Sequence, residues 1–240
     1  MASNLTTPLC GVLDITFPII QAPISASPSL VAAVSNAGGL GMIQATWHEI
    51  DELLDVIAEV RRLTDKPFGV NFVLPLSAEQ NYAKLDATLN AGVPVVSTFW
   101  ADPEPVIERI HRAGAIALHT IGTAEEARHV VDLGVDAVVA QGVEAGGHVW
   151  GQVGTMVLTP TVVDAVPDAH VIAAGGIADG RGLAAVLALG AEAAWVGTRL
   201  VLAEEFDGHE EYRRAIMSAK ETDTIHSSLF DLGWPDAPHR

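Results

Sequence analysis

The sequence has a single cysteine, few basic residues and no long uninterrupted hydrophobic run. With only Cys10, an intramolecular disulfide and a zinc site made of several thiolates are both excluded, and we expect no metal site. The 13 Lys and Arg residues leave a net charge of −17, which disfavours binding to nucleic acid and to anionic membranes. No apolar run reaches the roughly 18 residues of a membrane span, and residues 1–13 lack the pattern of a secretory signal. We therefore expect a soluble, cytoplasmic protein in a reducing environment.

Apolar residues are abundant, at 49% of the chain, and they occur as short runs that alternate with helical patterns. This alternation is typical of βα units and a parallel sheet. Most of the runs are apolar throughout, as expected for strands that are buried on both faces. The eight predicted strands cover residues 18–24, 40–45, 68–74, 93–100, 115–121, 137–143, 170–177 and 193–201.

Eight βα units favour a closed (βα)8 TIM barrel over a doubly wound open sheet, which usually has fewer strands and one dominant glycine loop. Thr123 with Glu126 predicts the capped start of one helix, and Thr159 before Pro160 predicts the start of another. Four predicted helices end at a glycine that can take the left-handed conformation, namely Gly92, Gly114, Gly134 and Gly190. We expect one barrel domain over residues 1–220, with a last helix at 210–220, and a polar tail over 221–240.

Glycines lie at the ends of the predicted strands seven and eight, where barrels often bind phosphate. Gly175 and Gly176 lie at the end of strand seven, and Gly197 and Thr198 lie in strand eight. Their exposed N–H groups, the threonine hydroxyl and a nearby helix N-terminus can hold an anion. These residues predict a phosphate site, although glycines also end strands for packing reasons.

A histidine directly follows two glycines in the stretch Ala-Gln-Gly-Val-Glu-Ala-Gly-Gly-His, at residues 140–148. Gly146 and Gly147 have no Cβ, so the backbone can approach a ligand closely. His148 can titrate near neutral pH and act as a general base. An exposed histidine without a role is the alternative interpretation. His119, at the end of predicted strand five, could also face the pocket.

Two amide side chains lie inside apolar strands and need hydrogen-bond partners. Asn71 belongs to predicted strand three and Gln141 to predicted strand six. A bound ligand is one partner for them, and a network inside the barrel is the other. At the end of strand one, a proline in the stretch Gln-Ala-Pro-Ile at residues 21–24 leaves backbone groups free to lie against a planar ring.

Together these stretches resemble the nitronate monooxygenase family, formerly called 2-nitropropane dioxygenases. The matching motifs run in order from about residue 15 to 205, and they include Gly-Val-Asn-Phe at 69–72, Ala-Ala-Gly-Gly-Ile-Ala-Asp-Gly at 173–180 and Val-Gly-Thr-Arg at 196–199. The resemblance implies a TIM barrel that binds FMN without a covalent bond. The predicted FMN-binding residues are Ala22, Pro23, Ile24, Asn71, His119, Gln141, Gly146, Gly147, Gly175, Gly176, Trp195, Val196, Gly197 and Thr198.

The resemblance also implies that His148 removes the acidic α-proton of a neutral nitroalkane. The nitronate is then oxidised with O2 to a carbonyl compound and nitrite, with the redox chemistry carried by the flavin. The family usually continues well beyond such a tail, so we expect a shortened C-terminal region. A homo-oligomer is possible through the apolar segment at residues 229–234.

Three other functions stay open at this point. Sister enzymes with the same Glu-Ala-Gly-Gly-His signature are NAD(P)H-dependent, namely a flavin-dependent enoyl-acyl-carrier-protein reductase and a quinone reductase. The second is a flavin-binding barrel without turnover. The last is a phosphate-binding barrel without flavin, which gives no special reason for the amides of Asn71 and Gln141.

Overall fold

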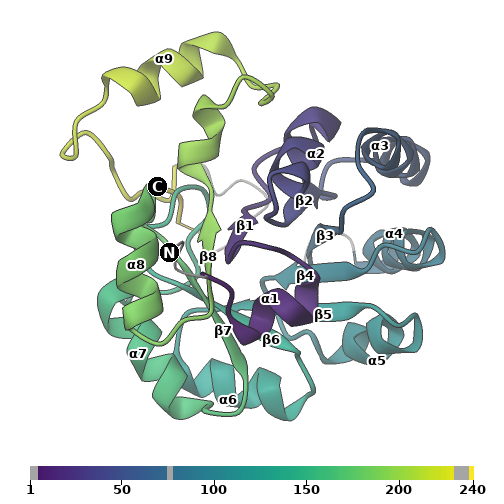
Figure 1. Cartoon of the computed structure of the whole chain (residues 1–240), viewed down its shortest axis with the longest axis horizontal. Helices are drawn as coiled ribbons and strands as arrows, with labels where there is room; N and C mark the ends of the chain where they lie inside the picture. Colours follow the sequence, from purple (N-terminus) through teal and green to yellow (C-terminus); the bar gives the residue numbers. More distant parts are fainter. Residues whose placement is uncertain (1–4, 75–77, 230–237) are drawn as a thin grey trace.

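The computed structural model describes residues 5–74, 78–229 and 238–240, and its centre is a ring of eight parallel strands (Figure 1). Around the ring the strands follow the order β1-β8-β7-β6-β5-β4-β3-β2. Between β1 and β2 the ring is joined by a parallel bridge of Ile20 with Leu40, where the Gln21 N–H donates to the Leu40 carbonyl at 2.9 Å. The predicted (βα)8 barrel is therefore confirmed. The strands are β1 (Ile19–Gln21), β2 (Gly41–Gln44), β3 (Phe68–Val73), β4 (Val95–Phe99), β5 (Ile116–Ile121), β6 (Ala137–Gln141), β7 (His170–Ala174) and β8 (Ala193–Val196).

Helices follow the strands along the chain and surround the ring. In Figure 1, α9 lies apart from this helical layer, and the chain then returns towards β8 and α8. The helices are α1 (Pro8–Leu13), α2 (Pro28–Asn36), α3 (Ile50–Leu63), α4 (Ala78–Asn90), α5 (Glu104–Arg112), α6 (Ala124–Asp132), α7 (Thr155–Ala165), α8 (Gly180–Ala188), the 3-10 helix η1 (Thr198–Leu202) and α9 (Glu210–Ser218). Among the described residues, no helix is both long enough and apolar enough to cross a membrane.

The strands bury both faces because their side chains alternate between the barrel interior and the helical layer. Met42 and Leu118 belong to the interior cluster, whereas Ile43 and Ala117 pack in the cluster beneath the helices. This alternation decides which polar residues can reach a ligand at the open end of the barrel. Only side chains in phase with Met42 and Leu118 point inward.

The short helix α1 closes the barrel at the amino ends of the strands, and the sequence analysis did not predict it. Its Leu9, Cys10 and Leu13 are fully buried in the interior cluster. The Leu9 N–H donates to the Glu192 carboxylate at 2.7 Å, and His170 Nδ1 lies 3.0 Å from the same oxygen. Ligands can therefore enter only from the opposite end, where the strands finish.

Several predicted element ends are confirmed, and others are wrong: the strands predicted at 18–24, 137–143 and 170–177 already end at Gln21, Gln141 and Ala174. The four predicted helix-ending glycines all have positive φ, and Thr123 forms its capping box with Glu126. Pro160, however, lies inside α7, which begins at Thr155, so Thr159 is not a helix cap. Strand eight ends at Val196, because the backbone turns at Gly197 into η1.

The last helix, α9, begins at Glu210 as predicted and ends at Ser218, two residues before the predicted end. Of the apolar segment 229–234, only Leu229 belongs to the described residues, where it is exposed.

Candidate active site

The loop that follows β6, at residues 142–154, carries His148 and is here called the histidine loop. A chain of hydrogen bonds joins it to the end of β7. One carboxylate oxygen of Glu144 accepts from both the N–H and the hydroxyl of Thr155, each at 2.9 Å. Thr155 Oγ1 also lies 3.0 Å from the carbonyl oxygen of Gly175. The histidine loop and the glycines after β7 are therefore held together at the first turn of α7.

Gln141 supports the same loop from inside the barrel. Its Nε2 donates to the carbonyl of His148 at 3.1 Å, and its Oε1 accepts from the Trp150 N–H at 2.8 Å. The amide thus binds the backbone on both sides of Val149. One side chain on a rigid strand thereby fixes the backbone on which the imidazole of His148 is carried.

Asn71 also faces the interior, on β3. Its Nδ2 donates to the Ser97 hydroxyl on β4 at 2.6 Å, and both side chains are buried. The interior network that was the alternative to a ligand is therefore present at Asn71. The amide still lies among the strand ends where a ligand would enter.

The glycines after β7 and β8 expose backbone donors at the open end of the barrel. Within the described residues, no acceptor contacts the N–H groups of Gly176, Gly197 or Thr198. Gly175 and Gly176 have φ values of 107° and 68°, a region that favours glycine. Unpaired donors in such a turn form a site for an anion such as phosphate.

Glycines also allow the loops of this end to approach one another closely. A Cβ at Gly146 would lie 2.5 Å from Thr198 Oγ1, which brings the histidine loop against the end of β8. A Cβ on Gly197 would lie 3.3 Å from Ala22 Cβ and 3.5 Å from a methyl of Ile24. The segment after β1, including Pro23, therefore lies beside the turn after β8 that exposes the N–H groups of Gly197 and Thr198.

Two predicted cofactor contacts, His119 and Val196, point elsewhere with their side chains. His119 alternates with the inward-facing Leu118, so its ring lies in the outer layer, 2.7 Å from the hydroxyl of Thr98. Val196 packs in the cluster of α8, and Trp195 lies in the barrel core. Burial lowers the pKa of His119 to about 4. The structure does not bring His119 to the other predicted site residues.

Aromatic side chains pack beside the histidine loop. Trp100 and Trp150 make an edge-to-face contact with ring centroids 4.5 Å apart, and Phe99 packs on Trp100. The Trp150 indole donates to the Glu126 carboxylate at 2.9 Å. Trp100 has a φ of 69°, which is rare for a residue with a Cβ, and such strain is common at functional sites. Together these rings form an apolar wall near the backbone of His148.

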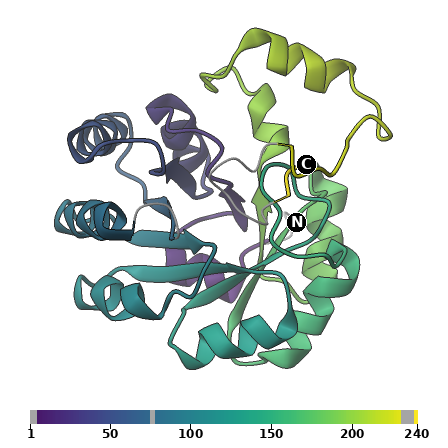
Figure 2. The same ribbon diagram turned by 180° about the vertical axis from the view of Figure 1, so that it is seen from behind.

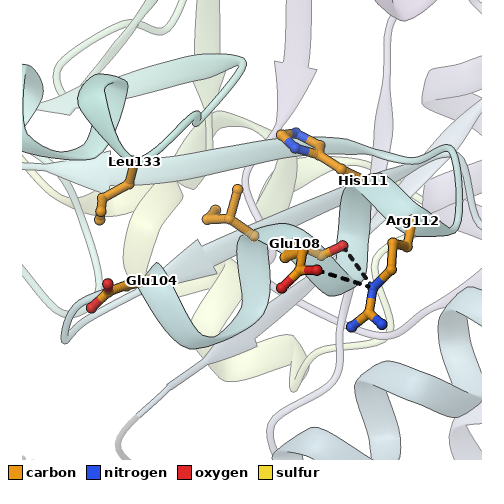
Figure 3. A pocket seen from close by; sticks show the side chains of 6 residues that line it. Glu104, Glu108, His111, Arg112 and Leu133 are labelled. Atoms are coloured by element: carbon orange, nitrogen blue, oxygen red, sulfur yellow. Dashed lines mark hydrogen bonds and ion pairs between the residues drawn. The ribbon is translucent and has the colours of Figure 1, made fainter.

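A separate surface hollow lies on the helical layer and does not belong to this site (Figure 3). It is lined by α5 residues such as Glu108 and Arg112, whose charged groups are 3.8 Å apart, and by Leu133. None of the predicted site residues contributes to it.

A family model described as nitronate monooxygenase matches residues 6–233. The chain belongs to the nitronate monooxygenase family. This is a family of flavin-dependent oxidoreductases, so membership supports a flavin as the cofactor. The resemblance inferred from the sequence is thereby confirmed.

Three relatives illustrate the range of names within this similarity. The chain is 38% identical over 241 residues to (3aS,4S,5R,7aS)-5-hydroxy-7a-methyl-1-oxo-octahydro-1H-indene-4-carboxyl-CoA dehydrogenase of Mycobacterium tuberculosis, covering 99% of this chain and 66% of the relative. FabK from Thermotoga maritima has a TM-score of 0.91 at 39% identity, covering 98% of this chain and 73% of FabK. A nitroalkane oxidase from Streptomyces ansochromogenes has a TM-score of 0.77 at 36% identity, covering 87% and 72%. The chain spans 66% of the length of this dehydrogenase and of its counterpart in Rhodococcus jostii.

One residue that lies against His148 was not predicted from the sequence. His239 was assigned to the tail, yet its ring centroid is 5.1 Å from that of His148, with the two rings nearly perpendicular. Glu144 and Ser97 were also not singled out. Glu144 belongs to the histidine motif itself, so its place in the sequence was a usable signal, whereas His239 gave none.

Proposed function

We propose that this chain binds FMN at the open end of the barrel and oxidises alkyl nitronates with O2, giving a carbonyl compound and nitrite. The observation that carries the proposal is the close approach of the loop that carries His148, fixed by Gln141, to the turns that expose the unpaired N–H groups of Gly176, Gly197 and Thr198. This arrangement supports a base and a phosphate site at the same end of the barrel. The nitroalkane oxidase neighbour and the family membership support the same reaction.

The residues fit a phosphorylated flavin. The donors of Gly176, Gly197 and Thr198 would hold the phosphate, and Ala22, Pro23 and Ile24 would lie on one side of the ring system. Asn71 and Gln141 would offer their amides from the barrel interior, and Gly146 and Gly147 would let the ring approach the histidine loop. When bound, the flavin supplies the electron transfer between the nitronate and O2.

His148 would act on the substrate and not on the cofactor. A neutral nitroalkane must lose the proton on the carbon next to its nitro group, and a neutral imidazole is a suitable acceptor near pH 7. A nitronate has already lost this proton and does not need the base. The apolar rings of Trp100 and Trp150 would favour the alkyl part of the substrate over a charged group.

The first test uses the visible absorption spectrum of the purified protein, with FMN added if none is retained. We expect a flavin spectrum that an alkyl nitronate bleaches under anaerobic conditions and that NADH does not. Bleaching by NADH alone would replace the proposal with an NAD(P)H-dependent reductase. Bound FMN that neither reagent reduces would indicate a binding barrel without turnover, and no FMN binding would refute the flavin site.

The second test separates the base from the rest of the site. In His148→Asn we expect kcat/KM for a neutral nitroalkane to fall by about 10²- to 10⁴-fold, the usual contribution of a general base. The value for the matching nitronate should change far less. His226→Asn, at an exposed histidine, is the control and should leave both values unchanged. An equal loss for both substrates in His148→Asn would contradict the base role.

A further inference from the structure

Residues 238–240 lie against the histidine loop, where His239 forms an isolated antiparallel bridge with His148, and Figure 2 shows the C-terminus next to this loop. The N–H of Gly147 donates to the Arg240 carbonyl at 3.0 Å, and the N–H of Arg240 donates back at 2.9 Å. The N–H of Val149 donates to the Pro238 carbonyl at 2.8 Å. Three backbone hydrogen bonds thus join the two segments on either side of His148.

The remaining contacts of residues 238–240 fix this segment in turn. On its other edge, His239 exchanges two backbone hydrogen bonds with Ser227, at 2.8 and 3.0 Å. The guanidinium of Arg240 donates to the Val143 carbonyl at 2.9 Å, at the start of the histidine loop. His239 lies opposite His148 in the pairing. Their ring centroids are therefore only 5.1 Å apart, with an angle of 89° between the ring planes.

The histidine loop needs such outside support because it contains Gly142, Gly146 and Gly147, and glycine has the greatest backbone freedom of any residue. Gln141 fixes the backbone of the loop from inside the barrel. Nothing in that contact fixes the side-chain torsions of His148. We propose that residues 238–240 are part of the active site, and that His239 is a positioning residue that holds the imidazole of His148 by perpendicular ring packing.

This inference rests on the proposed base role of His148, and it adds a second histidine that touches the base and not the substrate. Burial lowers the pKa of His239, so its ring is neutral near pH 7 and places no positive charge beside the base. Its contribution is therefore the contact itself. A ring of similar shape without nitrogen atoms should serve as well.

The ring contact is tested without any turnover by NMR of protein labelled at histidine Cε1, with the His148 signal assigned from His148→Asn. Because a ring 5.1 Å away shifts its neighbour, His239→Ala should move the His148 signal, and His226→Ala should not. An unchanged His148 signal in His239→Ala would overturn the inference, whatever the enzyme does.

The positioning role is tested by kinetics on the same variants. In His239→Ala we expect kcat/KM for a neutral nitroalkane to fall roughly tenfold, because a misplaced base transfers the proton less often. His239→Phe keeps a ring at this position and should restore the value to within about threefold, and the nitronate should be oxidised normally by both variants. An equal loss for both substrates, or no recovery in His239→Phe, would refute the positioning role. If the wild-type protein oxidises neither substrate, the proposed function fails, while the NMR result still decides the contact.

Discussion

The buried histidine of the outer layer makes the stability of this protein sensitive to mild acid. His119 is 4% exposed, and burial lowers its pKa from 6.5 to about 4, although Asp102 acts in the opposite direction. Between these two pH values His119 binds a proton in the unfolded chain but not in the folded protein. The free energy of unfolding is therefore unaffected by His119 above pH 6.5 and falls as the pH decreases from 6.5 towards 4. Below pH 4, His119 causes no further change.

The size of the effect follows from the shift. Each pKa unit corresponds to about 1.4 kcal/mol, so the full change is about 3 kcal/mol, of which about 2 kcal/mol is lost by pH 5. This is a large part of the 5–15 kcal/mol that typically stabilises a domain. The neighbouring hydroxyl of Thr98 is within 2.7 Å of Nδ1, but one hydrogen bond does not replace the lost hydration of an imidazolium.

The measurement is urea unfolding at pH 7 and pH 5 of the wild type, His119→Gln and the exposed-site control His226→Gln. All other titrating groups are common to the three proteins, so they cancel in the comparison. We expect the loss of unfolding free energy between the two pH values to be about 2 kcal/mol smaller in His119→Gln than in the wild type. The control should match the wild type. An equal loss in His119→Gln would refute the reasoning from burial.

Two further predictions concern the site. Gly175→Ala should lower the unfolding free energy by about 1–3 kcal/mol and weaken FMN binding in a fluorescence titration. The reasons are the φ of 107° at this position and the new Cβ, which would lie 2.8 Å from Thr155 Oγ1. Gly180→Ala is the control, because the space around its Cβ position is open. Gln141→Met removes two hydrogen bonds of about 1 kcal/mol each and should lower kcat/KM for a neutral nitroalkane by up to about 30-fold when activity is expressed per bound FMN, measured by absorbance. Unchanged kinetics in Gln141→Met would mean that the loop holds His148 without this amide.

The barrel was predictable because its signals are local and repeated. Each apolar run, each glycine at a helix end and each capping pair depends on residues close together in the chain, and eight repeats reinforce one another. The glycine turns and the histidine motif are also local. The wrong boundaries at Thr159 and at strand eight arose where a proline fits inside the second turn of α7 and where a single glycine turns the backbone.

The orientation of side chains and the distant contacts were not predictable in the same way. A strand buried on both faces carries apolar residues at every position, so nothing in 115–121 reveals that Leu118 points inward and His119 outward. The pairing of residues 238–240 with the histidine loop joins positions as far apart as Val143 and Arg240, 97 residues along the chain. Such a pairing leaves no pattern in either segment alone.

The closure of the ring between β1 and β2 has a consequence for how the protein moves. In the described part of the chain this junction is a single bridge at Ile20 and Leu40, whereas β3 and β4 are paired over five residues. It is the least strongly bonded seam of the barrel, and local opening begins where the fewest contacts must break. The seam ends beside Ala22 and Ile24, and β2 lies across the ring from β6. An opening at this seam would therefore move the wall proposed for the ring system and not β6, whose Gln141 holds the loop that carries His148.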